Sequence, residues 1–236
     1  MTRRRWIADD VSGNRAALTG AHADHLIRVL RARIGQEFDI LANGALHRGR
    51  IASIDGTRVE FELGEEIPAE APPVQLTLLL AIFKFDRMEW AIEKCTELGV
   101  ARIIPFIARR TDAHLVSASL KRVERWRRIA QQASEQSRRA TPVEISEPAK
   151  LRDALAITAR LKLLLSEAEE QYHLRDIPPN PDGEVLLAIG PEGGWTEDEQ
   201  EQFGANGWIS VSLGPTILRA ETAAIAATAI TMSALR

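Results

Sequence analysis

From Val74 onward the sequence alternates short apolar runs with segments of helical periodicity, and this alternation limits the possible folds more than any other feature. The run Leu76–Ile82 is continuously apolar, which is typical of a parallel strand that is buried on both faces. Further apolar runs are predicted as strands at Arg102–Ile107, Leu161–Leu165, Val185–Ile189 and Ile209–Leu213. The sequence therefore predicts an α/β domain with a mostly parallel sheet.

Three helices stand out between these strands. The first is predicted to open with Asp86 and Glu89 as a capping box and to end at Gly99. The second is a basic helix over Lys121–Arg139, whose inward positions are Val123, Trp126, Ala130 and Ala133. The last helix is rich in alanine and runs from about Ala220 to the end of the sequence.

Residues 1–68 follow a different pattern, because short strands there are separated by hairpin turns. Asn43-Gly44 and Asp55-Gly56 separate the strands predicted at Glu37–Ala42, Ala45–Ile54 and Thr57–Leu63. One helix is predicted at His22–Arg31, with Leu26, Val29 and Leu30 on its apolar face. We expect a small β-barrel, followed by an acidic, proline-containing linker over Glu65–Pro73.

The composition excludes several classes of protein. Hydrophobic residues make up 45% and charged residues 27%, which is ordinary for a globular domain. No apolar run approaches the roughly 20 residues that a membrane-spanning helix needs. The N-terminal arginines precede no apolar run, so we expect no signal peptide. With a single cysteine, Cys95, and five histidines at no metal-binding spacing, we expect a cytoplasmic protein without a disulfide or a metal site.

The net charge of −3 conceals a segregation of charge along the chain. Between Arg102 and Arg139 there are ten Arg or Lys residues against three acids, whereas Glu167 to Gln202 contains eleven acids and one arginine. Such a basic stretch attracts phosphate even in a mildly acidic protein. A solvated helix face is the alternative explanation.

Two glycine-containing loops follow predicted buried strands. The first, Gly190–Gly194, has three glycines in five residues and precedes Thr196 and Glu199, which form a second capping-box pattern. The other begins at Gly214 and leads through Arg219 into the last helix. Each is a tight turn or a place where the backbone approaches a ligand. Neither matches a dinucleotide or nucleoside-triphosphate fingerprint, so a ligand held by backbone groups in apolar surroundings is favoured.

These loops resemble the paired signatures of the ribosomal small subunit methyltransferase E family, which belongs to the SPOUT superfamily of knotted RNA methyltransferases. The resemblance covers nearly the whole chain. Its motifs, in order, are His25–Arg31, Lys84, Met88–Ile92, Lys94–Gly99, Ile104-Pro105, Arg109-Arg110, Glu135–Arg139, Ile189–Gly194 and Leu213–Thr222.

The resemblance implies a fold and an activity. It implies a PUA-like RNA-binding β-barrel over residues 1–68 and a SPOUT domain over residues 74–236, with a deep trefoil knot in roughly residues 160–236. It also implies a homodimer that forms through the C-terminal domain. The implied reaction transfers a methyl group from S-adenosylmethionine to N3 of a decoding-region uridine in 16S rRNA of the small ribosomal subunit.

The resemblance further implies roles for individual residues. Those implied to bind the cofactor are Ser166, Glu167, Ile189, Gly190, Pro191, Glu192, Gly193, Gly194, Leu213, Gly214, Ile217, Leu218, Thr222 and Ala223. Those implied to contact RNA are Arg28, Arg31, Lys84, Arg109, Arg110, Gln136 and Arg139. The candidate catalytic residues are Arg139, Arg219 and Glu221.

The chemistry leaves two roles open for the catalytic candidates. Uridine N3 must lose its proton, so either Glu221 acts as a base or a cation such as Arg139 or Arg219 stabilises the developing anion. Glu221 is equally well explained as a partner of the helix dipole. Arg139 falls on one predicted helical stripe with Glu135, and the two residues would also form an ordinary surface ion pair.

Two departures from the family pattern and three competing functions remain. The segment Gln136–Pro142 is one residue shorter than the family pattern leads us to expect. Family members usually carry a basic residue after Leu-Gly-Pro, where this chain has Thr216. A non-catalytic RNA-binding assembly factor would bind RNA but not the cofactor. A related knotted methyltransferase would keep the cofactor pocket and modify another RNA target. A nicotinamide-dependent oxidoreductase is disfavoured because the dinucleotide fingerprint is missing.

Overall fold

The computed structural model describes residues 5–68, 75–137, 139, 141–177 and 183–234. The chain divides into two compact units. The first contains residues 1–71 and 135–141, and the second contains residues 72–134 and 142–236. Among the described residues no helix has both the length and the apolar character that crossing a bilayer requires.

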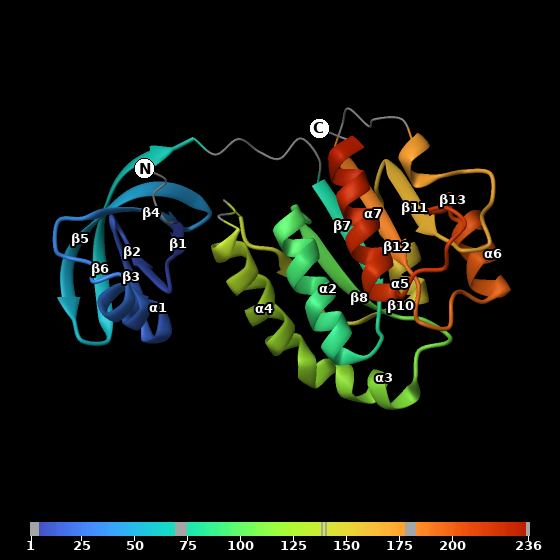
Figure 1. The fold of residues 1–236 in the computed structure, drawn as a ribbon, viewed down its shortest axis with the longest axis horizontal. Helices are drawn as coiled ribbons and strands as arrows, with labels where there is room; N and C mark the ends of the chain where they lie inside the picture. Colours follow the sequence, from blue (N-terminus) through green and yellow to red (C-terminus); the bar gives the residue numbers. More distant parts are fainter. Residues whose placement is uncertain (1–4, 69–74, 138, 140, 178–182, 235–236) are drawn as a thin grey trace. The chain divides into compact units, whose positions relative to one another are not determined.

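The first unit is built on a six-stranded sheet with the order β1-β4-β5-β6-β3-β2 (Figure 1). All of its described pairs are antiparallel except β1 with β4. The strands are β1 (Arg5–Ile7), β2 (Asp10–Ser12), β3 (Arg15–Thr19), β4 (Glu37–Ala42), β5 (Ala45–Asp55) and β6 (Arg58–Ile67). Leu18, Leu26, Ile40 and Phe61 lie at the centre of its core.

The predicted hairpins of this unit are confirmed. Asn43 and Gly44 adopt φ values of 51° and 81°, and Gly56 adopts 39°, as tight turns of this kind require. The predicted linker is partly wrong, because β6 continues to Ile67 and so includes Glu65–Ile67. Residues 69–73 of that prediction lie outside the described residues.

The predicted helix His22–Arg31 is also partly wrong. The structure has a short helix α1 (Gly20–Asp24) followed by the π-helical turn η1 (His25–Val29). Leu26 is fully buried, but Val29 is 65% exposed. A π turn changes the rotation per residue, so the 3.6-residue periodicity that placed Val29 inward no longer holds.

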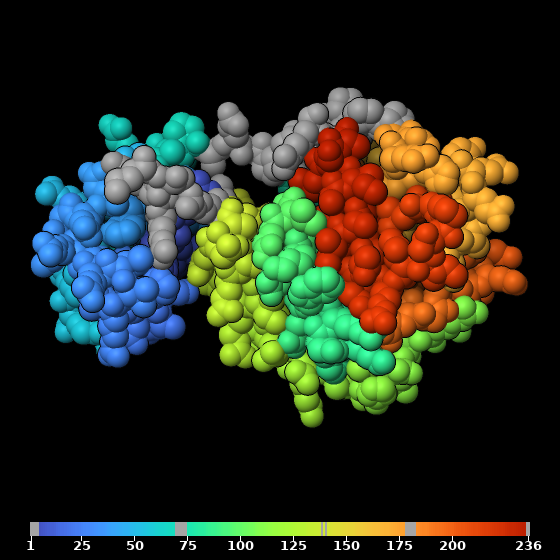
Figure 2. All heavy atoms as spheres, viewed as in Figure 1, coloured from blue at the N-terminus to red at the C-terminus, as the bar shows by residue number. Residues whose placement is uncertain are grey.

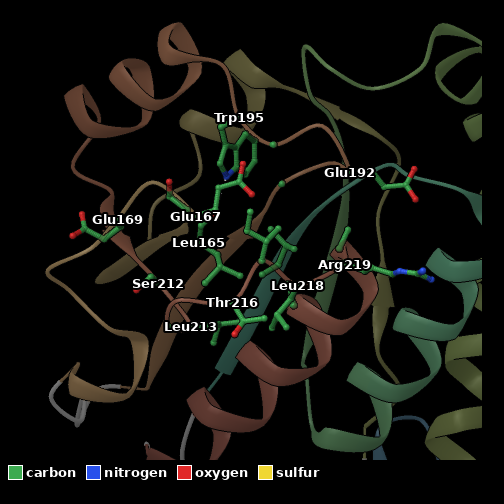
Figure 3. Close-up of a pocket in the computed structure, with 18 of the residues that line it drawn as sticks. Leu165, Glu167, Glu169, Glu192, Trp195, Ser212, Leu213, Thr216, Leu218 and Arg219 are labelled. Carbon is green, nitrogen blue, oxygen red and sulfur yellow. Dashed lines mark hydrogen bonds between the residues drawn. The ribbon is translucent and has the colours of Figure 1, made fainter.

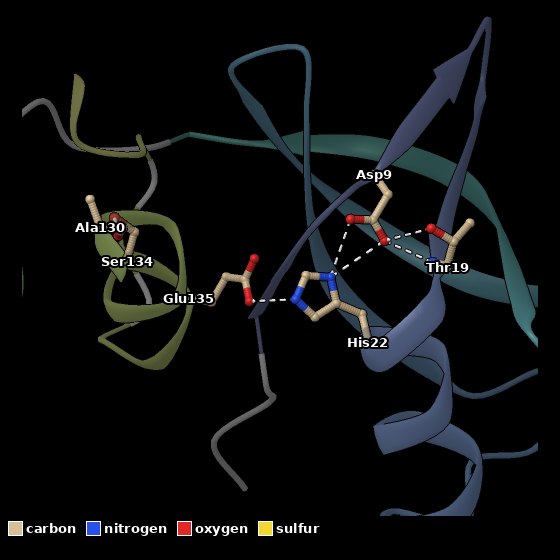
Figure 4. Close-up of polar contacts among 6 residues, drawn as sticks. All are labelled: Asp9, Thr19, His22, Ala130, Ser134 and Glu135. Carbon is tan, nitrogen blue, oxygen red and sulfur yellow. Dashed lines mark hydrogen bonds and ion pairs between the residues drawn. The ribbon is translucent and has the colours of Figure 1, made fainter. Parts of the chain in front are cut away.

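His22 joins two carboxylates of the first unit (Figure 4). Its Nε2 lies 3.0 Å from Glu135 Oε2, and its Nδ1 lies 3.2 Å from Asp9 Oδ1. The hydrogen bond to Glu135 is the main cause that raises the pKa of His22 to about 9. The imidazolium form is therefore favoured at neutral pH.

The second unit contains a seven-stranded sheet in which every described pair is parallel. The strand order is β10-β8-β7-β12-β11-β13, and β9 also pairs with β8. The strands are β7 (Gln75–Ala81), β8 (Arg102–Ile107), β9 (Glu144–Ile145), β10 (Ala149–Lys150), β11 (Leu161–Leu165), β12 (Glu184–Ile189) and β13 (Ile209–Val211). The predicted α/β class and parallel sheet are confirmed.

Helices cover both faces of this sheet. Helices α2 (Phe85–Leu98), α4 (Val123–Gln136) and α7 (Ala220–Ala234) lie side by side on one face (Figures 1 and 2). Helices α5 (Leu151–Leu155) and α6 (Glu197–Ala205) pack on the other face. Shorter elements are α3 (Ala113–Ser119), η2 (Leu120–Arg122) and η3 (Leu174–Asp176). Because successive strand residues face opposite helix layers, Leu78 and Leu79 join different cores.

Two details of the predicted helices are wrong. Helix α2 has Lys84 at its N-cap without a side-chain cap, and Glu89 instead accepts hydrogen bonds of 2.6 and 2.8 Å from Arg125. The basic helix is shorter than predicted, since a 3₁₀ turn precedes it and it ends at Gln136. Arg139 therefore lies beyond the helix and outside the predicted stripe.

Candidate functional site

The second unit contains a cavity of about 790 Å³ at the carboxyl ends of β11, β12 and β13 (Figure 3). The sheet order places β11 between the other two strands, so the segments that follow all three strands meet there. These segments are Leu165–Glu170 with His173, Ile189–Trp195, and Ser212–Ala220. This edge of a parallel sheet is where ligands of α/β proteins bind.

The first glycine loop is shaped by Trp195. The indole Nε1 donates a 2.8 Å hydrogen bond to the carbonyl of Leu165, which holds the ring between two of the lining segments. A Cβ atom added at Gly190 would lie only 3.1 Å from this ring. Gly194 adopts a φ of 69° and donates a 2.9 Å hydrogen bond to the carbonyl of Pro191. Glycine at these positions therefore allows the loop to fold tightly against the indole.

Two arginines that follow β8 contact this loop and helix α6 from outside the cavity. Arg110 Nη1 donates a 2.7 Å hydrogen bond to the carbonyl of Gly193. The backbone N–H of Arg109 donates to Glu199 Oε1 at 2.8 Å. Glu199 is fully buried and forms the predicted capping box with Thr196, which is confirmed. Both arginine side chains are exposed, and they also fix the position of the loop and of helix α6.

The second loop leads from β13 into helix α7. Gly214 adopts a φ of 116°, a conformation that other residues rarely adopt. Ser212 lies at the entrance to this loop, and its hydroxyl is 2.9 Å from Nδ1 of His173, which also lines the cavity. Ile217 lines the cavity but is 79% exposed, so the loop presents an apolar side chain at its mouth.

Helix α2 contributes one further lining residue, Arg87. Its Nη1 lies 2.8 Å from Glu192 Oε1 in the first loop, and its Nε lies 3.6 Å from Glu221 Oε1 in the first turn of α7. Arg87 therefore connects both loop regions to the same helix.

The cavity lining includes twelve of the fourteen residues predicted to bind a cofactor: Ser166, Glu167, Ile189, Gly190, Pro191, Glu192, Gly194, Leu213, Gly214, Ile217, Leu218 and Ala223. Gly193 and Thr222 are not part of the lining. Gly193 instead accepts the hydrogen bond from Arg110.

The three catalytic candidates have different positions. Arg219 lines the cavity, whereas Glu221 is buried beside it and pairs with Arg87. Arg139 belongs to the first unit and does not line the cavity. Its Nε donates a 3.2 Å hydrogen bond to the carbonyl of Thr141, and burial lowers its pKa from the usual value.

The residues predicted to contact RNA are almost all exposed. Arg28, Arg31, Lys84, Arg109, Arg110 and Gln136 have exposed side chains, while Arg139 is half-buried. Arg28, Arg31, Gln136 and Arg139 belong to the first unit, and the others belong to the second.

Several lining residues were not predicted from the sequence. Among them are Arg87, Glu169, Glu170, His173, Gln200 and Ser212. Of these six, only Ser212, near the end of the predicted strand Ile209–Leu213, carries a signal that would have identified it. Arg87 and Gln200 lie on helices, where nothing local distinguishes them from ordinary surface residues.

The lining combines opposite charges with apolar surface. Glu167, Glu169, Glu170 and Glu192 supply carboxylates, and Arg87 and Arg219 supply guanidinium groups. Figure 3 shows Glu169 and Ser212 on one side of the cavity and Glu192 and Arg219 on the other. The described residues contain no group of three or more His, Cys, Asp or Glu side chains placed to hold a metal ion.

Comparison with known proteins identifies the family to which this chain belongs. The model of the RNA methyltransferase domain matches residues 70–232, which include every residue that lines the cavity. Ribosomal RNA small subunit methyltransferase E of Mycobacterium tuberculosis is 34% identical over 92% of this chain and 85% of its own length. The chain belongs to the ribosomal RNA small subunit methyltransferase E family.

Solved structures of similar proteins agree with this family. The ribosomal RNA small subunit methyltransferase E of Neisseria gonorrhoeae, bound to S-adenosyl methionine, is 31% identical with a TM-score of 0.85, covering 99% of this chain and 98% of that one. A putative methyltransferase of Legionella pneumophila, in complex with the same cofactor, is 29% identical with a TM-score of 0.85 and the same coverage. The chain is thus an RNA methyltransferase of this family over both of its units.

Proposed function

We propose that this protein transfers a methyl group from S-adenosylmethionine to N3 of a decoding-region uridine in 16S rRNA. The observation that carries the proposal is the convergence of both glycine loops on one cavity at the carboxyl edge of the parallel sheet. The two similar proteins of solved structure, which match almost the whole chain, are bound to S-adenosylmethionine. Relatives that carry the name ribosomal RNA small subunit methyltransferase E support 16S rRNA as the substrate.

The residues present fit S-adenosylmethionine. A nucleoside base needs flat apolar surroundings, and Leu165, Ile189, Leu213 and Leu218 would supply them. The cofactor also carries positive charge on its ammonium and sulfonium groups, which the carboxylates of the lining would favour. The backbone groups of the two glycine loops would approach the ligand closely, because no Cβ atoms stand in the way at residues 190, 194 and 214.

The proposed mechanism assigns Arg219 the main catalytic role. The bound cofactor supplies an electrophilic methyl group on a sulfonium. N3 of uridine must lose its proton to solvent, and the uracil imide that forms carries negative charge. Arg219 lines the cavity and would stabilise that charge, an effect typically worth about 10²–10³ in rate. Glu221 is a weaker candidate for the base, because it is buried outside the lining and pairs with Arg87.

The finer points of architecture form part of the proposal. The mostly antiparallel sheet of the first unit supports a PUA-like RNA-binding barrel over residues 1–68, with Arg28 and Arg31 exposed for phosphate contact. Gln136 and Arg139 would extend this RNA surface. Lys84, Arg109 and Arg110 would contact RNA from the second unit, the SPOUT domain over residues 74–236.

The knot, the dimer and the cellular location also belong to the proposal. A trefoil knot over roughly residues 160–236 is supported by the order β12-β11-β13, in which the chain returns after β12 to pair β13 with the far edge of β11. A homodimer through the second unit would cover half-buried apolar residues of α7 such as Ile225 and Ile230. Activity on small ribosomal subunits places the protein in the cytoplasm.

The proposal is tested by methyl transfer from labelled S-adenosylmethionine to small ribosomal subunits from cells that lack this protein. Nucleoside mass spectrometry should then identify N3-methyluridine. Label on another nucleoside, or only on tRNA, would refute the assignment of the substrate. A failure to bind the cofactor in calorimetry would refute the methyltransferase activity and favour a non-catalytic RNA-binding factor.

Two variants separate binding from chemistry in the same assay. Arg219→Ala should lower the transfer rate about a hundredfold while cofactor affinity changes little. Arg139→Ala, in the first unit, should reduce transfer through weaker RNA contact with unchanged cofactor affinity. If Arg139→Ala abolishes cofactor binding, its assignment to the RNA surface is wrong.

A further inference from the structure

Arg87 occupies an unusual position between the two loops that form the cavity. It lies in the first turn of α2, and its guanidinium contacts a carboxylate from each loop region. Glu192 belongs to the first glycine loop, and Glu221 follows the second loop at the start of α7. The pairs are separated by 105 and 134 positions in the sequence, so they constrain the tertiary structure and not a single element.

The two ion pairs are not equivalent. The Glu192 side chain is 34% exposed, and an exposed pair of this kind contributes little to stability by itself. The Glu221 side chain is only 7% exposed. Its Oε2 atom is buried and has no hydrogen-bond partner among the described residues. Removing the cation beside such a buried carboxylate leaves its charge uncompensated, which is strongly unfavourable.

Resting on the proposed function, we infer that Arg87 is a positioning residue that holds both cofactor loops in their binding conformation. It neutralises Glu221 at the start of α7 and, with the same guanidinium group, fixes Glu192 in the first loop. The two loops are thereby held at a constant separation before the ligand enters. Such preorganisation raises affinity because binding no longer has to order the loops.

The geometry requires an arginine. The planar guanidinium presents separate N–H groups, and here Nη1 faces Glu192 while Nε faces Glu221. A lysine ammonium is a single compact charge on a flexible stem, so it would neutralise Glu221 but would not hold both carboxylates at once. Arg87→Lys should therefore restore only part of the function that Arg87→Gln loses.

The test compares Arg87→Gln and Arg87→Lys with a matched control, Lys94→Gln. Lys94 lies on the same helix and pairs with Glu93 and Glu97, away from the cavity lining. In the ligand-free protein, hydrogen exchange of amides in residues 190–195 and 214–222 should become about tenfold faster in Arg87→Gln. Exchange should be unchanged in Lys94→Gln and intermediate in Arg87→Lys.

Kinetics separate positioning from a general loss of structure. Arg87→Gln should raise the Kd and KM for S-adenosylmethionine about tenfold, while the KM for RNA and the saturated kcat stay within about twofold of wild type. A variant that merely misfolds would instead lower kcat through a smaller active fraction. The double variant Arg87→Gln/Glu221→Gln should bind the cofactor more tightly than Arg87→Gln, because the buried charge is removed.

Each outcome decides the inference. Unchanged exchange in both loops, or a lower kcat with an unchanged KM, would overturn it, as would a double variant no better than Arg87→Gln. If wild-type protein binds no S-adenosylmethionine, the proposed function fails. The exchange comparison needs no ligand, so faster exchange in Arg87→Gln would still show that Arg87 holds the two loops.

Discussion

Gly190→Ala provides a sensitive test of how the first cofactor loop is built. The added Cβ atom would lie 3.1 Å from Cε2 and Nε1 of the Trp195 indole, closer than such contacts normally are. The ring has little freedom to move away. Its Nε1 donates to the carbonyl of Leu165, and the ring packs against Phe106 in a tilted contact and Phe203 in an edge contact, at centroid distances of 5.8 and 5.1 Å. The loop backbone must therefore shift by a few tenths of an ångström.

The magnitude follows from the cost of overpacking. Inserting one methyl group into a well-packed site typically costs about 1–3 kcal/mol. We expect a loss near the middle of that range, about 2 kcal/mol, because the indole is fixed by both a hydrogen bond and ring contacts. For a chain of this size that corresponds to a lower Tm by about 4–8 °C. The Kd for S-adenosylmethionine should rise by about tenfold, since the displaced backbone lines the cavity.

The assay is thermal unfolding of Gly190→Ala with and without the cofactor, together with calorimetry of cofactor binding. Gly204→Ala is the matched control, because a Cβ atom there meets nothing within 4 Å and Gly204 lies inside α6. That variant should be stabilised by about 0.5–1 kcal/mol, as is usual when alanine replaces glycine in a helix. A Tm of Gly190→Ala within 1 °C of wild type, with unchanged affinity, would refute the role given to the indole.

Three further predictions concern titratable groups. Glu199→Gln should lower the free energy of unfolding by about 1–3 kcal/mol in urea unfolding. Both carboxylate oxygens of Glu199 act as hydrogen-bond acceptors, from Arg109 N on one side and from Thr196 on the other. The NH₂ group of a glutamine would face one of these donors and leave it without an acceptor. His22, whose pKa is raised to about 9 chiefly by Glu135, should stabilise the fold fully below pH 6.5. This contribution should disappear as the pH rises through 9, so the Tm difference between wild type and His22→Gln should shrink between pH 6 and pH 10; a constant difference would contradict the ion pair. Burial raises the pKa of Cys95 to about 12, so its thiol should react with a disulfide reagent only in denaturant.

Local sequence patterns predicted the elements well where tertiary contacts did not compete. Two similar capping-box patterns show the difference. Thr196 and Glu199 form the box, because the buried Glu199 has its other oxygen occupied by a compatible N–H donor. Asp86 and Glu89 have the same spacing but form no capping box, because both carboxylate oxygens of Glu89 accept hydrogen bonds from Arg125 of a neighbouring helix. A four-residue sequence pattern contains no information about a cation that comes from a distant part of the chain.

The N-terminal unit shows a second limit. Asn43 and Gly44 predicted their hairpin correctly, since a positive φ at both positions is a local property. The helix that follows β3 was misjudged because its second half is a π turn, and periodicity analysis assumes 3.6 residues per turn. Val29 is exposed for this reason.

The cavity could be anticipated only in part. The glycine loops were found because each follows a buried strand, and all carboxyl ends of a parallel sheet meet at one edge. The position of β11 between β12 and β13 does not follow from chain order, so the contribution of His173 was not foreseen. Arg87 was missed because its two partners come from other parts of the chain.

The charges of the cavity suggest how donor and acceptor are kept apart. Arg87 pairs with Glu192 and Glu221, whereas the guanidinium of Arg219 forms no ion pair or hydrogen bond with any described residue. In the proposed mechanism, Arg219 is thus the lining cation that would meet negative charge on the uracil. Glu169 lies on the opposite side of the cavity, where a positively charged group is favoured (Figure 3). Because Thr216 supplies no second cation to the same loop, transfer should depend on Arg219 more strongly than it would with a basic residue there.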